Sequence, residues 1–138
     1  MKIRERFSNV YGMNGNKLFV DTNICIYLLN DDRIIADFLD GYQIYISFIT
    51  EIELYAYHSS NPLAKQVLDE FIKAVNVVNI DEAIKHRTIE IRRDFKLKLP
   101  DSIIAASAMV EGISFITADK GFKKLAELSI VLYDPANN

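Results

Sequence analysis

The sequence predicts one α/β domain with a mainly parallel five-stranded sheet flanked by about seven helices. Its 138 residues suit a single domain, because domains average about 150 residues, and half of them are hydrophobic, which is enough for an ordinary core. Short β-rich runs alternate with helical segments, and this alternation is typical of crossover units that build a parallel sheet covered on both faces. No internal repeat, linker or low-complexity tract interrupts it.

The N-terminal residues stand apart from this pattern. Residues 1–16 are polar, with glycines and asparagines near their end, and they carry no apolar periodicity. We therefore expect residues 1–16 to form a loosely attached extension and residues 17–138 to form the folded domain. Residues 1–12 are expected to be dispensable for folding.

The first half of the domain is expected to contain two strands and four helices. Residues 17–20 form a short apolar run typical of a buried strand, and residues 43–49 are a second β-rich run. The helices follow from apolar side chains at helical spacing and from the Asn61-Pro62 pair, because asparagine caps helices and proline suits their first turn. Their expected ranges are 23–30, 32–39, 50–57 and 61–74.

The second half is expected to contain three strands and three helices. A long helix over 81–97 follows from one stripe of side chains at helical spacing: Ile84, Thr88, Ile91 and Phe95. Another helix begins at Pro100 and ends before Gly112, because glycine suits the left-handed position that follows a helix. The remaining elements are strands at 75–80, 113–116 and 130–133 and a short helix at 122–128.

Composition and charge exclude several classes of protein. The single cysteine, Cys25, excludes a disulfide-stapled miniprotein, and the longest apolar run, at residues 103–110, is far too short to span a membrane. The N-terminus lacks the apolar segment of a secretory signal peptide, so a cytoplasmic location is expected. The formal net charge of -3 indicates no general affinity for nucleic acid, and any polyanion site must therefore be local.

Acidic residues follow the expected strands. Asp21 comes directly after the first strand, Glu53 lies in the first helical turn after the second, and Asp119 comes shortly after the fourth. Asp81 follows the third strand, and Asp101 lies at the start of the helix that leads into the fourth. Because the carboxyl ends of parallel strands meet at one edge of the sheet, these carboxylates are expected to approach one crevice.

Each of these acids also has a purely structural explanation. Residues 50–53 match a capping box, in which Glu53 would satisfy backbone donors. Asp21 and Asp119 are suited to cap helices, and the helix dipole favours an acid at Asp101. Asp81, which is followed by another acid, is best explained as a cap.

A cluster of carboxylates predicts a bound cation. Carboxylates that converge repel one another and raise one another's pKa, so that a cluster is favourable only when a positive charge lies among them. Oxygen ligands without histidine or cysteine indicate Mg²⁺ or Mn²⁺.

Four sequence blocks carry a resemblance to a known family. They are Phe-Val-Asp-Thr-Asn at 19–23, Ile-Thr-Glu-Ile-Glu-Leu at 49–54, the segment 98–106 with its Pro-Asp-Ser, and Phe-Ile-Thr-Ala-Asp-Lys-Gly-Phe at 115–122. In this order and spacing the chain resembles the PIN-domain family over residues 17–133, and within it the VapC-type toxin ribonucleases. Two positions depart from the family pattern: Tyr57, where a glycine is common, and Gly121, where some members carry a further acid.

The resemblance implies a metal-dependent endoribonuclease that hydrolyses RNA phosphodiester bonds with Mg²⁺ or Mn²⁺. Its catalytic and metal-binding residues would be Asp21, Glu53, Asp101 and Asp119. The implied role is the toxin of a type II toxin–antitoxin pair, with RNA, a protein antitoxin and a second copy of the chain as partners. The alternatives are a PIN-domain nuclease that is not a toxin and a catalytically inactive module that binds nucleic acid or protein. A metal-free acid–base pair of His58 and His86 is a further alternative, which EDTA would distinguish.

Supporting roles are expected for polar and basic residues near the blocks. Thr22 and Thr117 are candidates to hold carboxylates in place, and Asn23 is a candidate to orient Asp21 or to contact substrate. Two groups of cations are candidates to bind the RNA backbone. One is a stripe along the long helix over 81–97, formed by Lys85, Arg92 and Lys96 with Arg93 beside them, and the other lies near the last two blocks: Lys98, Lys120, Lys123 and Lys124. The alternative for these cations is a solvated helix face paired with Glu90 and Asp94.

The first two helices carry more apolar side chains than one buried face needs. We expect some of them to be exposed or shared with a protein partner: Ile26, Tyr27, Ile34, Ile35, Phe38 and Leu39.

Overall fold

The structure is a computed structural model that describes residues 16–58 and 60–135. Its five strands form one all-parallel sheet in the order β3-β2-β1-β4-β5. The strands are β1 (Lys17–Val20), β2 (Gln43–Ser47), β3 (Asn76–Val78), β4 (Ser114–Thr117) and β5 (Ile130–Leu132). The helices of the described part are α2 (Thr22–Leu29), α3 (Arg33–Leu39), α4 (Phe48–His58), α5 (Pro62–Ala74), α6 (Glu82–Asp94) and α7 (Leu99–Glu111), with a 3₁₀ helix, η1 (Lys120–Lys124).

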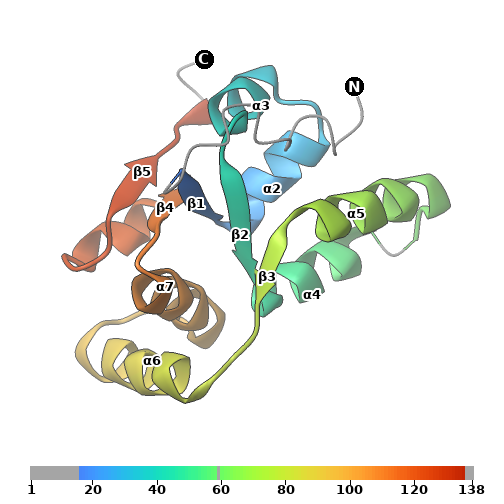
Figure 1. The fold of residues 1–138 in the computed structure, drawn as a ribbon. Coiled ribbons are helices and arrows are strands. Elements are labelled where there is room, and N and C mark those ends of the chain that lie inside the picture. The colour runs from blue at the N-terminus through green and yellow to red at the C-terminus, as the bar shows by residue number, and fades with distance from the viewer. Residues whose placement is uncertain (1–15, 59, 136–138) are drawn as a thin grey trace.

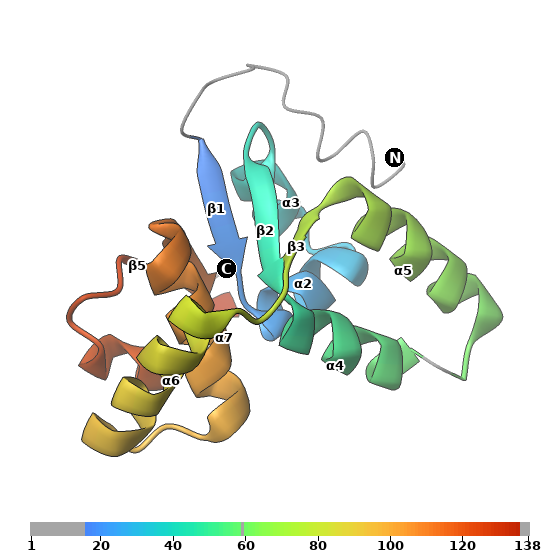
Figure 2. The ribbon, with the colours of Figure 1, turned by 60° about the horizontal axis from the view of Figure 1, so that its bottom comes forward.

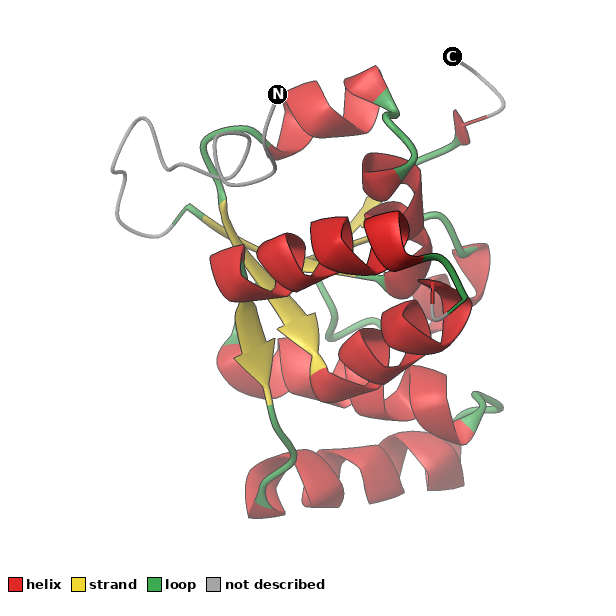
Figure 3. Cartoon of the chain, turned by 90° about the vertical axis from the view of Figure 1, so that its right-hand side faces the viewer, coloured by secondary structure: helices red, strands yellow, loops and turns green. Residues whose placement is uncertain are grey.

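Helices cover both faces of the sheet, as the alternation of elements predicted. Along β1, Leu18 and Val20 point to one face and join a core cluster with residues of α2, α3, α4 and α5. Phe19, between them, points to the other face and packs with residues of α6, α7 and η1. Figure 1 and Figure 2 show α6 and α7 on the opposite side of the strands from α2, α4 and α5. Figure 3 shows the yellow strands between red helices.

The order of strands creates a switch point between β1 and β4. From β1 the chain continues to β2 and β3 on one side, and β4 and β5 add to the other side. The backbone remains paired just beyond β1, where Asp21 N donates to Ile116 O at 3.0 Å. In open parallel sheets the ligand crevice lies beyond the carboxyl ends of the strands at this reversal. The residues that follow β1 and β4 are therefore expected to border the ligand crevice.

Two element boundaries differ from the sequence prediction around β2 and α4. The second strand ends at Ser47 and the helix begins at Phe48, two residues before the expected Thr50. The Ser47 hydroxyl accepts from Ile49 N at 3.1 Å and so has the capping role expected for Thr50. Thr50 itself lies within the helix, and its side chain is buried.

The helices of the second half are shorter than expected. The helix over 81–97 ends at Asp94, and the Arg92 guanidinium donates to Leu97 O at 2.6 Å across the turn that follows. The short helix expected at 122–128 is the 3₁₀ helix η1, with a tight bond from Leu125 N to Phe122 O at 3.0 Å. The expected end of α7 is confirmed, because Gly112 has the left-handed φ of 68°.

The expected N-terminal extension lies almost wholly outside the described residues, which begin at Asn16. In the part of the chain that the structure does describe, no helix is both long and apolar enough to cross a bilayer.

Candidate active site

Asp21 is the most buried acid at the switch point. It follows β1 and caps α2, and only 5% of its surface is exposed. The Thr117 hydroxyl, from β4, donates to its Oδ2 at 2.6 Å, and Thr22 N donates to its Oδ1 at 2.9 Å. The cap expected from the sequence is therefore present, but the bond from Thr117 shows that the carboxylate is also held from the neighbouring strand.

Burial makes the Asp21 carboxylate unusually basic. Loss of solvation raises its pKa from 3.8 to about 6, the charges of Asp101 and Asp119 add to this rise, and the bonds from Thr117 and Thr22 oppose it. The structure describes residues 16–58 and 60–135, and no ion pair within this set involves Asp21. The fold therefore buries a carboxylate that no side-chain cation of the described residues pairs with.

Asp101 approaches the same place from α7. This helix is buried along Ser102 to Ala108, and the small side chains of Ala105 and Ala106 allow it to lie close to the sheet. Burial raises the pKa of Asp101, and the negative charges of Asp119 and Glu53 raise it further. The mutual influence of these charges indicates that the acids gather at one edge of the sheet.

Asp119 is linked to Asp21 through one hydroxyl. Asp119 N donates to Thr117 Oγ1 at 3.0 Å, and Asp119 Oδ1 accepts from Gly121 N at 2.8 Å, which caps η1. A Cβ at Gly121 would lie 3.0 Å from Asp119 Oδ1. A larger residue at position 121 would therefore crowd the Asp119 carboxylate in its present position.

Glu53 is held by α2 and not by its own helix. The Thr22 hydroxyl donates to Glu53 Oε1 at 2.6 Å, and the Thr50 hydroxyl therefore supplies the hydrogen of the 2.9 Å bond between the two threonines. The capping box considered for residues 50–53 is wrong, because α4 begins before Thr50 and Glu53 turns to a hydroxyl of another helix. Sequence reasoning missed Thr50 as part of this network, because the same residue pattern is typical of a helix start.

Asp81 and Asn23 lie outside the network of bonds around Asp21. Asp81 Oδ1 accepts from Ile84 N at 2.8 Å, which confirms its role as the cap of α6. Asn23 is exposed on α2, and its role stays a prediction.

The expected cations divide into paired and unpaired groups. Lys85 pairs with Glu82 at 3.2 Å, and Arg93 pairs with Asp94 at 3.0 Å, so both are already neutralised on α6. Three of the other cations predicted to bind the RNA backbone form no ion pair within the described residues: Arg92, Lys96 and Lys120. The charge of Lys98 lowers the pKa of Asp101, which places Lys98 close to the acids.

The two histidines lie on different helices. His58 belongs to α4, where its Nδ1 contacts Leu54 O at 2.9 Å, and His86 is exposed on α6. Among the contacts between described residues, none joins either histidine to Asp21, Glu53, Asp101 or Asp119.

The carboxylate oxygens are the donors available to a metal ion. Within residues 16–58 and 60–135, no three His, Cys, Asp or Glu side chains are grouped as they would be around a bound metal. The exposed side chains of Glu53 and Asp119 are instead turned to Thr22 and to the backbone of Gly121.

Comparison with known proteins relates this fold and this site to one family. The family model described as PIN domain matches residues 18–128. A search of curated proteins found no match.

Solved structures share the fold over almost their whole length. A chain of a toxin–antitoxin complex from Klebsiella pneumoniae is 30% identical, with a TM-score of 0.75 and coverage of 85% of this chain and 98% of that chain. A chain of VapBC2 from Rickettsia felis, bound to a promoter DNA fragment, is 23% identical, with a TM-score of 0.75 and coverage of 86% and 99%. A chain of FitAcB from Neisseria gonorrhoeae is 22% identical, with a TM-score of 0.71 and coverage of 88% and 99%. Because the family model spans most of the chain, this chain belongs to the PIN-domain family.

Proposed function

We propose that this protein is a metal-dependent endoribonuclease and the toxin of a type II toxin–antitoxin pair. The observation that carries the proposal is the buried Asp21 carboxylate, which is fixed by Thr117 and influenced by two further acids but has no ion-pair partner within the described residues. A divalent cation would supply the missing charge. The 30% identity to a chain of a toxin–antitoxin complex supports the toxin role and a cytoplasmic location, where RNA is available.

The donor set fits Mg²⁺ or Mn²⁺. Asp21, Asp101, Glu53 and Asp119 offer hard oxygen ligands, which these two ions prefer, and the neighbouring described residues add no histidine or thiolate that would select zinc or copper. Cys25 contributes no competing ligand, because it is fully buried and burial raises the pKa of its thiol.

The residues have distinct roles in the proposed reaction. A divalent ion bound here would lower the pKa of water and stabilise negative charge on the leaving oxygen of an RNA phosphodiester. Asp21 and Asp101 hold the ion, and Glu53 and Asp119 complete the site. Thr117 fixes Asp21 and also Asp119 N, while Thr22 fixes Glu53 and, through its backbone, Asp21. This network fixes the Asp21 carboxylate at the switch point and ties Glu53 and the Asp119 backbone to the same two threonines.

A second function has one observation in its favour. The side chains as they stand bring no three ligands together in the described part of the chain, and this favours a catalytically inactive binding module. We prefer the enzyme because Glu53 and Asp119 are exposed and their charges raise the pKa of Asp101, which places both of them near it. A nuclease without a toxin role remains the alternative within the enzyme class.

A protein antitoxin and a second copy of the chain are the proposed protein partners. Exposed apolar side chains on α3 and α5 suit such contacts, with exposed fractions of 49% for Ile34, 40% for Phe38 and 75% for Leu63. Ile35 and Leu39, in contrast, are buried, so part of this apolar set is exposed as expected, and its contact with a partner stays a prediction.

Metal-dependent RNA cleavage tests the enzymatic proposal. Purified protein incubated with structured RNAs should cut them in Mg²⁺ or Mn²⁺, lose this activity in EDTA, and regain it when excess Mn²⁺ is added. Mapping of the cut ends on a sequencing gel measures it. Cleavage that persists in EDTA would contradict the carboxylate mechanism and favour the His58 and His86 alternative.

Replacement of Thr117 by valine should weaken Mn²⁺ binding by about 10–100-fold, the usual cost of losing a partner that orients a metal ligand. Its hydroxyl lowers the pKa of Asp21, so its removal raises that pKa further and leaves less carboxylate at neutral pH. Isothermal titration between pH 6 and 8 should show the loss, largest at pH 6. Thr117→Ser keeps the hydroxyl and should bind as the parent does; equal affinities of all three proteins would refute the role given to Thr117.

A further inference from the structure

An open cleft lies at the turn between α6 and α7. Its cavity volume is about 370 Å³, and it is lined by Arg92, Phe95, Lys96, Leu97 and Lys98. This volume falls within the range of roughly 300–1,000 Å³ that is typical of small-ligand sites. Three of the five lining side chains carry a positive charge, and the cleft therefore suits an anionic ligand.

The cations of the cleft are not neutralised by the protein. Arg92, Lys96 and Lys98 take part in no ion pair between described residues, whereas Lys85 and Arg93 on the same segment do. The Arg92 guanidinium donates to Leu97 O at 2.6 Å, which fixes its position and leaves its other N–H groups for a ligand. Lys124 adds a fourth cation at this turn, because its Nζ donates to Lys96 O at 3.4 Å.

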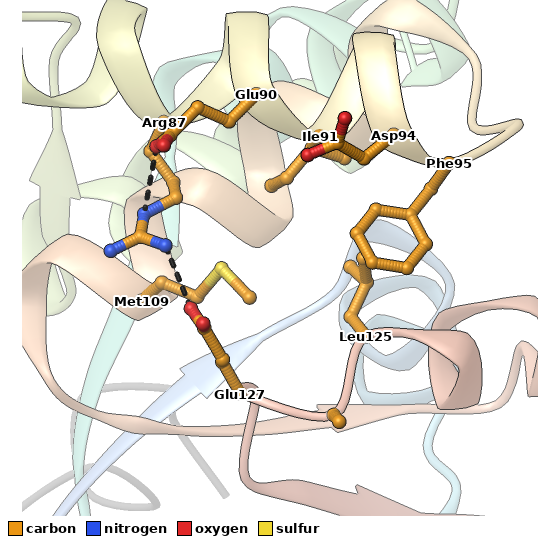
Figure 4. A pocket seen from close by; sticks show the side chains of 9 residues that line it. Arg87, Glu90, Ile91, Asp94, Phe95, Met109, Leu125 and Glu127 are labelled. Atoms are coloured by element: carbon orange, nitrogen blue, oxygen red, sulfur yellow. Dashed lines mark hydrogen bonds and ion pairs between the residues drawn. The ribbon is translucent and has the colours of Figure 1, made fainter.

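Phe95 gives the cleft an aromatic surface. It is half-buried and packs against the core cluster that contains Ile91 and Leu125, so the side chain is held by the core while also lining the cleft. Phe95 also lines a second pocket, where three carboxylates surround an apolar floor: Glu90, Asp94 and Glu127. Figure 4 shows this second pocket, in which Arg87 reaches both glutamates. These carboxylates would repel a phosphate in the second pocket. Of the two pockets that Phe95 lines, the cationic cleft is therefore the one suited to a nucleic acid.

The cleft adjoins the acids of the active site. Lys98 lines it and is also the cap residue of α7, three residues before Asp101. A nucleic acid strand with one phosphate at the acids would have its neighbouring nucleotides within reach of Lys98 and the cleft behind it. Positive grooves with an aromatic surface are the common means of binding single strands, because the cations hold phosphates and the ring stacks on an unpaired base.

We infer that this cleft is a subsite for a single-stranded segment of the RNA substrate, in which Phe95 stacks on an unpaired base and Arg92, Lys96 and Lys98 bind the flanking phosphates. The inference rests on the proposed ribonuclease function and names where that enzyme holds its substrate. Two of the cations predicted from the sequence to bind RNA, Arg92 and Lys96, are thereby assigned to one site at the turn after α6.

RNA binding in EDTA tests the subsite without cleavage. Fluorescence anisotropy of a labelled single-stranded RNA of ten nucleotides gives the dissociation constant over a range of salt concentrations. Phe95→Leu, which keeps the apolar volume but removes the ring, should weaken binding by about 10-fold, within the energy of one stacked base. Phe95→Tyr should bind as the parent does.

A second variant tests the phosphate contacts. Lys96→Ala/Lys98→Ala should weaken binding and reduce the magnitude of the salt slope by about 1.4, because each lost phosphate contact on a single strand contributes about 0.7. Lys65→Ala/Lys73→Ala removes the same charge from α5, on the other face of the sheet, and should leave the salt slope nearly unchanged. The melting temperature of each variant shows that it is folded.

The outcomes separate the subsite from the proposed function. A parent protein that binds and cuts RNA while both cleft variants bind as tightly as the parent would overturn the subsite and leave the ribonuclease standing. Equal losses in the α5 control, or duplex RNA bound as tightly as the single strand, would also overturn it, because a stacking site needs an unpaired base. A parent that neither binds nor cuts RNA would overturn both proposals.

Discussion

Asp21→Asn should increase the free energy of unfolding of the metal-free protein by about 1–3 kcal/mol at pH 7. The native fold raises the pKa of Asp21 from 3.8 to about 6, and each pKa unit corresponds to about 1.4 kcal/mol, so the buried charge costs up to about 3 kcal/mol. Asparagine removes this charge and keeps an oxygen for the bond from Thr22 N and a polar group for Thr117.

The pH dependence identifies the cause of this gain. Because the native pKa exceeds the unfolded one, the native state binds the extra proton between about pH 4 and pH 6, and the parent loses stability as the pH rises through this window. The difference between variant and parent should thus be near zero below pH 4 and reach its full value above pH 6. Urea denaturation in EDTA at pH 4, 5, 6 and 7 measures it.

Asp81→Asn is the matched control for this experiment. Asp81 also follows a strand and caps a helix, but it is exposed, whereas Asp21 is buried. Its replacement should give no stability gain that develops between pH 4 and pH 6. An Asp21→Asn variant less stable than the parent at pH 7 would show that the charged carboxylate stabilises the fold. It would contradict the claim that burial of this charge costs free energy.

Asp101→Asn should reduce RNA cleavage by more than about 100-fold, since loss of a metal ligand should exceed the 10–100-fold cost typical of the groups that only orient ligands. The same substitution should abolish the rise in melting temperature that Mn²⁺ causes in the parent, because a ligand that binds only the native state stabilises it. Burial and the charges of Asp119 and Glu53 raise the pKa of Asp101, so the neutral variant is expected to fold.

In cells, the same variant tests the toxin role. Induction of the parent should arrest growth, and Asp101→Asn should relieve the arrest, while Asp81→Asn should arrest growth as the parent does. Parent protein that accumulates in folded form without slowing growth would contradict the toxin role and leave the nuclease chemistry to the cleavage assay.

The fold could be predicted, and so could the approach of Asp21 to Asp119, because both follow from the order of strands and the positions of their ends. Parallel strands place their carboxyl ends at one edge, so Asp21 and Asp119 had to approach each other once β1 and β4 became neighbours. The sequence could only suggest that Thr117 links them. Threonine is common at the ends of strands, and its presence there does not reveal which groups its hydroxyl bonds.

The errors arose where one pattern serves two purposes. Residues 50–53 match a capping box, but the helix begins earlier, at Phe48, and the Ser47 hydroxyl accepts from Ile49 N at its start. Thr50 therefore does not cap the helix, and its hydroxyl bonds with Thr22. The apolar stripe that ends at Phe95 predicted a helix to residue 97, but α6 ends at Asp94. Hydrophobic periodicity could not reveal that Arg92 donates to Leu97 O and closes a turn there. The cleft at that turn follows from this bond, so the sequence indicated its cations but not their arrangement.

Anomalous X-ray diffraction from crystals soaked in Mn²⁺ tests the central claim most directly, because it locates the metal without relying on activity. The account predicts one or more manganese peaks at the switch point between β1 and β4, about 2.1 Å from carboxylate oxygens of Asp21 and Asp101, with Glu53 or Asp119 rotated toward the ion. Manganese bound only elsewhere, or no peak at a concentration that supports RNA cleavage, would contradict it.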